Sequence, residues 1–281
     1  MAVVHPELQT LLSSFPPGLL PKYCEMDATL LRTLFDHPLD SEAVEVASVT
    51  DIAIATAHGN LPARLYQPEA SNDKFMLYFH GGGFVMGTLD THDTLCRLLS
   101  QALGCVLVSV VYRLAPEHPF PCATDDCMEA LRWACTHKSQ WVSDVAPVLL
   151  AGDSAGATLC VSTALQARSE PGLNIAAQIL LYPTLEPPQD NDSYRLWGGG
   201  EYFLGRDMMR YFWDSYLGEA DKNHDYAAPA FAQNLEGLPK TLVVTAQYDP
   251  LADEAVVFSE RLKQAGVAQA SMQAPAMIHG F

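Results

Sequence analysis

The residues with the clearest chemical potential lie in the segment Gly152-Asp153-Ser154-Ala155-Gly156, which has the spacing G-x-S-x-G. An apolar run, Val148 to Ala151, precedes this segment, and a helical pattern begins at Ala155. A serine on a sharp turn between a strand and a helix exposes its hydroxyl, and it needs small neighbours because the backbone packs closely there. The N–H groups at the start of the helix favour a negative charge that develops beside the serine. The segment therefore predicts that Ser154 is a nucleophile.

A second chemical feature is the run of three glycines, Gly81 to Gly83, which follows His80 at the end of another apolar run, Phe75 to Phe79. Because glycine has no Cβ, the N–H groups of Gly81, Gly82 and Gly83 can approach a carbonyl oxygen closely. A tight turn without a further role is the alternative. A dinucleotide-binding loop is excluded, since its spacing requires a third glycine where Met86 stands.

An acid and a base follow the serine in the order that α/β hydrolases use. Asp249 comes after the apolar run Thr241 to Ala246, and His279 comes after the run Ala270 to Gln273. Each residue alone has another explanation, because an aspartate often caps a helix or a turn and an isolated histidine is usually structural. The four features together, each at the end of an apolar run, favour a catalytic set of Ser154, Asp249 and His279.

The elements that would hold these residues alternate along the chain. Eight short apolar runs predict strands at Val49–Ala55, Ala63–Gln67, Phe75–Phe79, Val106–Tyr112, Val148–Ala151, Gln178–Leu181, Thr241–Ala246 and Ala270–Gln273. Helical spacing of apolar residues predicts helices at Thr91–Leu103, Ala123–Thr136, Ala155–Arg168, Arg206–Leu217 and Ala252–Gln264. Several of the strands are apolar on both faces, as in a parallel sheet covered on both sides. The order predicts an α/β fold with a mostly parallel sheet.

Two stretches interrupt this alternation. Residues 1–45 have a helical pattern broken by prolines at positions 16, 17, 21 and 38, and residues 185–237 form an insertion rich in aromatic residues. We expect a catalytic domain over residues 46–281 that contains the insertion at about 185–237. The aromatic residues are expected either to pack against the core or to form a lid over a site.

Composition excludes several classes of protein. The chain has 281 residues, 49% of them hydrophobic and 17% charged, which is typical of a folded protein. The net charge of -17 disfavours nucleic acid and anionic membrane surfaces as partners. We find neither a signal-peptide pattern nor an apolar run of about 18 residues that would span a membrane. The seven cysteines are odd in number and form no C-x-x-C pair, which indicates reduced thiols and a cytoplasmic location.

Taken together, these motifs resemble those of the hormone-sensitive-lipase family of α/β hydrolases, and the segment from Gly87 to Asp93 is similar to its bacterial acetyl esterase branch. The segments that carry the resemblance are His80–Phe84, Tyr112–Glu117, Gly152–Gly156, Asp249–Leu251 and His279–Phe281. The sequence differs from the family at Val111, where the family usually has Asp. The family also continues past the base through a terminal helix, which is missing from a chain that stops at Phe281.

The resemblance implies an α/β-hydrolase fold with an eight-stranded sheet, flanking helices and a helical cap. It also implies a hydrolase of short-chain acyl esters in which Ser154 is the nucleophile, His279 the base and Asp249 the residue that orients the base. The oxyanion hole maps onto Gly81, Gly82, Gly83 and Ala155, with the N–H groups of Gly82, Gly83 and Ala155 as its donors and with His80 and Asp153 as supporting motif residues. The cap maps onto residues 1–45 and part of 185–237.

Other functions use the same residue types and stay open at this point. An amidase or a lactonase has the same catalytic set, and hydrolase folds also serve as small-molecule-binding proteins without catalysis. We expect no cofactor and no metal, because His92, Asp93, His118 and Asp125 do not have the spacing of a ligand set. A small neutral ester is the expected partner, and the protein is expected to be a monomer or a homodimer.

Overall fold

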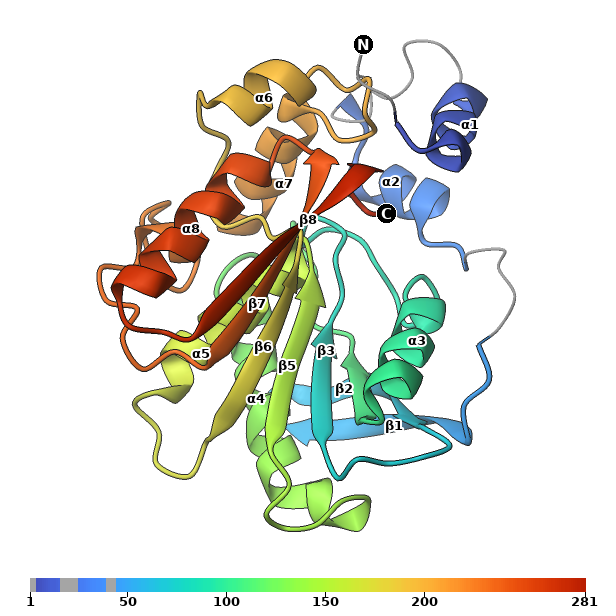
Figure 1. Ribbon diagram of the computed structural model, residues 1–281, viewed down its shortest axis with the longest axis vertical. Helices are drawn as coiled ribbons and strands as arrows, with labels where there is room; N and C mark the ends of the chain where they lie inside the picture. Colours follow the sequence, from blue (N-terminus) through green and yellow to red (C-terminus); the bar gives the residue numbers. More distant parts are fainter. Residues whose placement is uncertain (1–3, 16–24, 39–43) are drawn as a thin grey trace.

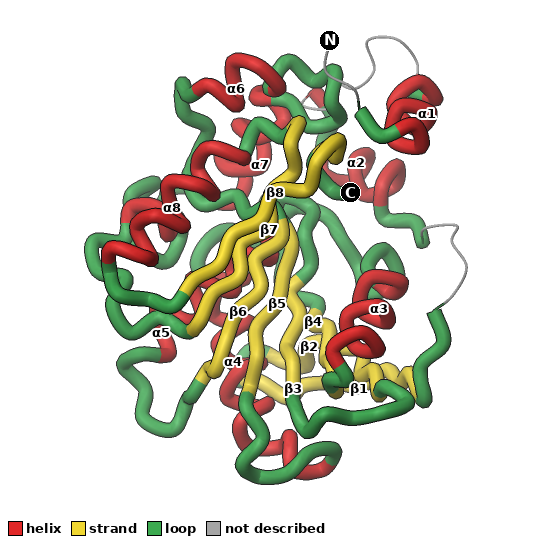
Figure 2. Tube along the Cα trace, viewed as in Figure 1, coloured by secondary structure: helices red, strands yellow, loops and turns green. Residues whose placement is uncertain are grey.

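The computed structural model of the protein describes residues 4–15, 25–38 and 44–281. Its centre is an eight-stranded sheet with the strand order β1-β2-β4-β3-β5-β6-β7-β8 (Figure 1). The strands are β1 (Ser48–Thr56), β2 (Gly59–Gln67), β3 (Phe75–Phe79), β4 (Val106–Val110), β5 (Val148–Asp153), β6 (Ile175–Leu181), β7 (Lys240–Tyr248) and β8 (Gln269–Ile278). Figure 2 shows the strands as one twisted sheet, with β1 at one edge and β8 at the other.

The sheet is mostly parallel, as the sequence predicts. Strands β1, β2 and β4 pair antiparallel in that order, and every pairing from β4 through β3 to β8 is parallel. The predicted strand at 106–112 is too long, because the chain leaves the sheet after Val110. Tyr112 then donates its hydroxyl to the carbonyl of His80 at 2.7 Å, and the N–H of Arg113 donates to Asp126 at 2.8 Å.

Helices cover both faces of the sheet and extend over the carboxyl ends of its strands. They are α1 (Pro6–Ser14), α2 (Ala28–Phe35), α3 (Asp93–Leu103), α4 (Cys122–His137), α5 (Ala155–Ala167), α6 (Asp192–Trp197), α7 (Arg206–Leu217) and α8 (Ala252–Gln264), with short 3-10 helices η2 (Lys138–Gln140) and η3 (Pro229–Phe231). The five helices predicted from sequence correspond to α3, α4, α5, α7 and α8. The short helix α6 was not predicted.

The alternation of side chains along β3 explains the two-layer core. Phe75, Leu77 and Phe79 are buried in the cluster formed with α4, α5 and α8. Met76 and Tyr78 are buried in a separate cluster, to which α3 contributes Cys96 and neighbouring side chains. Successive residues of a strand point to opposite faces, so an entirely apolar strand requires cover on both sides. Helix α3 therefore lies on one face, and α4, α5 and α8 lie on the other (Figure 1).

The carboxyl ends of the parallel strands meet at the end of the sheet where α1, α2, α6 and α7 lie (Figure 1). The two sequence stretches that interrupt the alternation supply these helices, α1 and α2 from residues 1–45 and α6 and α7 from residues 185–237. Residues 1–3, 16–24 and 39–43, which include the prolines at 16, 17 and 21, lie outside the described residues.

Two further features bear on the sequence predictions. None of the helices among the described residues is long and apolar enough to cross a bilayer. The cysteines in the described part of the chain are all free thiols, namely Cys96, Cys105, Cys122, Cys127, Cys135 and Cys160.

Candidate active site

Three residues that are far apart in the sequence form a hydrogen-bonded series at the carboxyl end of the sheet. Ser154 follows β5, Asp249 follows β7 and His279 follows β8. His279 Nε2 lies 3.0 Å from Ser154 Oγ, and His279 Nδ1 lies 2.8 Å from Asp249 Oδ2. All three side chains are buried. The structure thus brings together the serine, acid and base predicted from the order of motifs.

The turn at Ser154 has the strained backbone that a nucleophile between a strand and a helix requires. Ser154 has φ 49° and ψ -116°, which side-chain-bearing residues rarely adopt, and its N–H donates to the carbonyl of Leu181 at 2.8 Å. Gly156 lies against β3, since a Cβ there would lie 1.9 Å from the carbonyl oxygen of Phe79. Close packing of α5 on β3 therefore explains the second glycine of the motif, and it places the first helical N–H, that of Ala155, beside the serine.

Asp249 performs two tasks with its two carboxylate oxygens. Oδ1 accepts the N–H of Leu251 at 2.8 Å, which closes the turn before α8, and Oδ2 contacts His279. The sequence presented a turn role and a catalytic role as alternatives, and the geometry accommodates both. Because a carboxylate only accepts hydrogen bonds, the proton of neutral His279 lies on Nδ1, and Nε2 is free to accept the proton of Ser154.

The glycine turn presents backbone N–H groups to the same place. Gly83 has φ 61°, and a Cβ there would lie 2.3 Å from the ring of Phe212, so no other residue fits without movement. In the described part of the chain, the N–H groups of Gly82, Gly83 and Ala155 donate to no protein acceptor. Gly81 differs, because its N–H donates to Asp153 Oδ1 at 2.8 Å. The N–H of Gly81 therefore already has an acceptor within the protein, and the assignment of Gly81 to the oxyanion hole stays a prediction.

His80 supports the glycine turn from within the core. Its ring stacks on Tyr112 with centroids 4.3 Å apart, and Nδ1 lies 2.7 Å from the carbonyl oxygen of Gly81. Burial lowers the pKa of His80 to about 4, so this imidazole is neutral near pH 7. Its position explains why a histidine precedes the glycines, since the ring fixes the direction in which the turn leaves β3.

Asp153, the residue before Ser154, is also buried. Burial alone would raise its pKa, but the charge of His92 and the hydrogen bonds from His92 and Tyr78 lower it to about 2. Asp153 is therefore a carboxylate at any pH at which His279 could act as a base. Sequence analysis considered His92 only as a metal ligand, which its spacing did not support, and it did not identify Tyr78. The resemblance to the family in the segment Gly87–Asp93 was the available signal for His92.

A cavity of about 410 Å³ opens at the serine. The side chain of Met86 and side chains from α3 and the insertion contribute apolar atoms to its wall, and the residues after β6 and β8 complete it. The lining residues are Gly82, Gly83, Met86, Thr91, His92, Thr94, Leu95, Leu98, Asp153, Ser154, Tyr182, Phe203, His279, Gly280 and Phe281. The arrangement can hold a small, largely apolar molecule with a carbonyl group between Ser154 and the free N–H groups.

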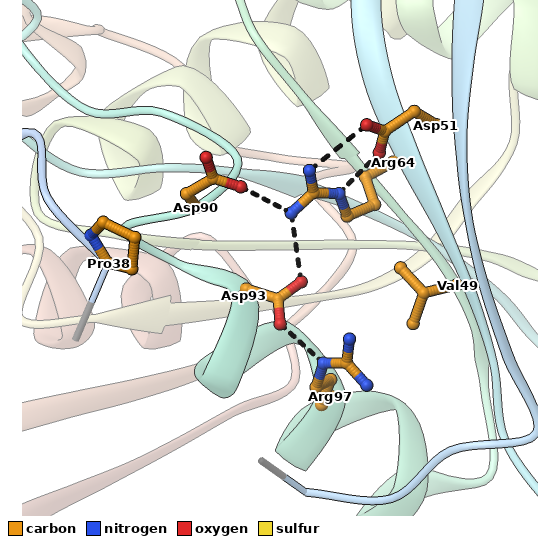
Figure 3. A pocket seen from close by; sticks show the side chains of 7 residues that line it. All are labelled: Pro38, Val49, Asp51, Arg64, Asp90, Asp93 and Arg97. Atoms are coloured by element: carbon orange, nitrogen blue, oxygen red, sulfur yellow. Dashed lines mark hydrogen bonds and ion pairs between the residues drawn. The ribbon is translucent and has the colours of Figure 1, made fainter. Parts of the chain in front are cut away.

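A second cavity, of about 420 Å³, contains arginines and aspartates (Figure 3). Figure 3 shows Arg64 between Asp51, Asp90 and Asp93, with Arg97 on the other oxygen of Asp93. Asp93 therefore pairs with two arginines. No group of three metal-ligating side chains occurs among residues 4–15, 25–38 and 44–281.

Comparison with known proteins places the chain in a family. Residues 76–281 match the family described as α/β hydrolase fold. Esterase LipI of Mycobacterium tuberculosis is 39% identical over 257 residues, which cover 89% of this chain and 79% of LipI. Ethyl acetate hydrolase of Pseudomonas putida is 31% identical over 99% of this chain and 92% of its own. A solved esterase from Pyrobaculum calidifontis has a TM-score of 0.86 and 35% identity over 99% of this chain and 91% of that one.

Fold, motifs and relatives agree. The chain belongs to the α/β-hydrolase fold family, within its group of esterases similar to hormone-sensitive lipase.

Proposed function

We propose that this protein hydrolyses short-chain acyl esters, from acetyl to about hexanoyl, as a serine carboxylesterase. The observation that carries the proposal is the hydrogen-bonded series from Asp249 through His279 to Ser154. A carboxylate, an imidazole and a hydroxyl in this order allow the imidazole to take the hydroxyl proton while the oxygen attacks a carbonyl carbon.

In the proposed reaction, Ser154 Oγ bonds to the ester carbon as His279 Nε2 takes the serine proton. The tetrahedral oxyanion accepts hydrogen bonds from the N–H groups of Gly82, Gly83 and Ala155. His279 then gives its proton to the departing alcohol oxygen as the ester C–O bond breaks, which leaves Ser154 acylated. A water oxygen then bonds to the acyl carbon as His279 takes a proton from the water. His279 returns that proton to Ser154 Oγ as the bond from Oγ to the acyl carbon breaks, which releases the acid and restores the serine.

The cavity supports a small neutral substrate. Leu95 and Leu98 from α3, together with Met86 and Phe203, supply apolar wall, which suits a short acyl or alkyl group. The net charge of -17 repels anionic ligands at long range and leaves a neutral ester unaffected.

We further propose that α1, α2, α6 and α7 act together as the cap of the site. Phe203 in the insertion lines the cavity, and its ring lies 6.2 Å from Phe15, next to α1, and 6.3 Å from Phe35 at the end of α2. Aromatic contacts at these distances couple the N-terminal segment to the insertion over the cavity.

The proposal is tested by measuring hydrolysis of p-nitrophenyl acetate, butyrate and octanoate by the wild type and by Ser154→Ala. The wild type is expected to prefer acetate and butyrate, and Ser154→Ala is expected to lower kcat by about 10⁴- to 10⁶-fold with an unchanged circular dichroism spectrum. An organophosphate should add to Ser154, as read by mass spectrometry of the tryptic peptide.

The matched control is Ser169→Ala, which alters an exposed serine just beyond α5 and should retain wild-type turnover and labelling. Absence of turnover with no adduct at Ser154 would favour a binding protein without catalysis. Turnover of anilides or lactones above that of esters would favour an amidase or a lactonase.

A further inference from the structure

His92 reaches from the start of α3 to the residue beside the nucleophile. It occupies the N-cap position of α3, and its Nε2 lies 3.4 Å from Asp153 Oδ1. The His92 side chain is 15% exposed and that of Asp153 is 9% exposed, and both residues line the cavity at Ser154. The pair is therefore largely shielded from water, and opposite charges attract each other more strongly there than in bulk solvent.

Both ring nitrogens of His92 lie close to oxygen atoms that can accept a hydrogen bond. Thr91 Oγ1 lies 2.8 Å from His92 Nδ1, and the hydroxyl donates its own hydrogen to the carbonyl of Thr88 at 2.9 Å. The oxygen of Thr91 is thus an acceptor for Nδ1–H. The carboxylate of Asp153 is an acceptor for Nε2–H, so the ring satisfies both contacts as an imidazolium.

The electrostatic surroundings of His92 agree with this assignment. Burial alone would lower its pKa, but the charges of Asp153 and Asp36 and the hydrogen bonds of the ring raise it above the usual value. His80, with its ring centroid 5.5 Å away, is neutral, and the hydroxyl of Tyr78 donates to Asp153. The dipole at the start of α3 disfavours a cation, with a weaker effect than a buried carboxylate at 3.4 Å.

Asp153 in turn connects the glycine turn Gly81–Gly83 to Ser154. Its Oδ1 accepts the N–H of Gly81, the first glycine of the turn, and its backbone is bonded directly to Ser154. A shift of this carboxylate would move the N–H groups of Gly82 and Gly83 relative to the serine. Catalytic groups that are misplaced by about 1 Å lose about 100-fold in rate.

We propose that His92 is a positioning residue. It is an imidazolium, and its pairing with Asp153 holds the glycine turn Gly81–Gly83 in the correct position relative to Ser154. The inference rests on the proposed function and adds a requirement to it, since the relevant state of the enzyme has His92 protonated and His279 neutral.

The test compares His92→Gln with His58→Gln, which alters an exposed histidine of the β1–β2 turn. Helix α3 should stay in place in His92→Gln, because Asp93 is held separately by Arg64, Arg97 and the hydroxyl of Tyr66. For p-nitrophenyl butyrate, kcat of His92→Gln is expected to fall about 10- to 100-fold, with KM within about twofold of wild type. His58→Gln is expected to match the wild type.

The pH profile of kcat separates positioning from a merely structural role. Because the pKa of His92 is raised, the imidazolium persists to higher pH than that of a free histidine and is lost as pH rises further, so wild-type kcat is expected to fall on the alkaline side. That alkaline fall should be absent from His92→Gln. Thr91→Val removes the acceptor of Nδ1–H, makes the imidazolium less stable and should move the alkaline fall to lower pH.

A double substitution tests whether His92 acts through Asp153. Asp153→Asn is expected to lower kcat on its own, and adding His92→Gln should lower it little further, because the contact is already lost. Independent, multiplicative losses would contradict the proposal.

Wild-type kcat in His92→Gln, or an alkaline fall that persists there, would overturn this inference and leave the esterase function intact. If His92→Gln does not fold, an alkaline fall that fails to move in Thr91→Val overturns the inference equally. Absence of wild-type turnover and of an adduct at Ser154 would overturn the proposed function and this inference with it.

Discussion

The two cavities to which α3 contributes are similar in volume and opposite in chemistry. His92, Leu95 and Leu98 face the cavity at the serine, whereas Asp93 and Arg97 belong to the cavity around Arg64. In the second cavity the charged groups satisfy one another, with Arg64 contacting three carboxylates (Figure 3). In the first, the N–H groups of Gly82, Gly83 and Ala155 have no protein acceptor among the described residues.

The difference shows that volume and charge alone do not mark a reactive site. Arginines paired with aspartates form a network that stabilises the junction of β1, β2 and α3, and its exposed members contribute modestly. The serine cavity instead combines N–H groups without a protein acceptor among the described residues, the strained backbone of Ser154 and the hydrogen-bonded series from Asp249 through His279 to Ser154. These features suit a reaction at a carbonyl group. Substitutions in the two cavities should therefore separate activity from stability.

Apart from the loss of Ser154 itself, the largest effect is expected from Asp249→Asn. The N–H of Leu251 needs an oxygen acceptor, so the amide oxygen would remain there and the amide nitrogen would face His279. An NH₂ group donates, which forces the proton of the imidazole onto Nε2 and removes the base. We expect kcat to fall about 10³- to 10⁴-fold with little change in thermal stability, as measured with p-nitrophenyl acetate.

The control for this prediction is Asp144→Asn, which alters an exposed aspartate before β5 and should leave kcat unchanged. A loss below about tenfold in Asp249→Asn would show that another group orients His279, contrary to the site described.

An intermediate effect is expected from Gly83→Ala. The new Cβ would lie 2.3 Å from the ring of Phe212, and φ is 61°, so the turn must move and carry the N–H of Gly83 with it. We expect kcat to fall about 100-fold with a smaller change in KM, because a displaced donor acts mainly on the transition state.

Gly172→Ala is the matched control for backbone strain, since Gly172 has φ 91° and open space around its Cα. It should lower stability by about 1 kcal/mol and leave kcat intact. Equal losses of kcat in the two variants would mean that strain, and not the lost oxyanion donor, explains the effect.

The smallest effect on activity is expected from Arg64→Gln. It removes the central cation from the second cavity, where Arg64 is 16% exposed and Asp51 and Asp90 are mostly exposed. We expect the free energy of unfolding in urea to fall by about 1 kcal/mol, and by less in 1 M salt, while kcat stays within about twofold of wild type. A larger loss of kcat would show that the second cavity is coupled to the serine through α3.

Much of the fold was readable from the sequence because its signals are local. Apolar runs on both faces predict buried parallel strands, and the segment Gly152–Gly156 predicts a strained turn from its small residues alone. The end of β4 was misplaced because Val111 and Tyr112 continue its apolar run, and only the tertiary structure shows that the Tyr112 hydroxyl donates to the carbonyl of His80. The short helix α6 was not predicted because a helix of this length depends on tertiary contacts.

The sequence by itself determined which residues could perform the chemistry, because residue type, order and position at strand ends follow from the chain. Tertiary structure decided how they are used. In the folded protein, Asp249 accepts the N–H of Leu251 and also contacts His279. The N–H of Gly81 donates to Asp153, and His92 pairs with the same carboxylate. These assignments depend on distances of a few ångströms between segments tens of residues apart, and a sequence pattern carries no information about which hydrogen-bond partner is closest.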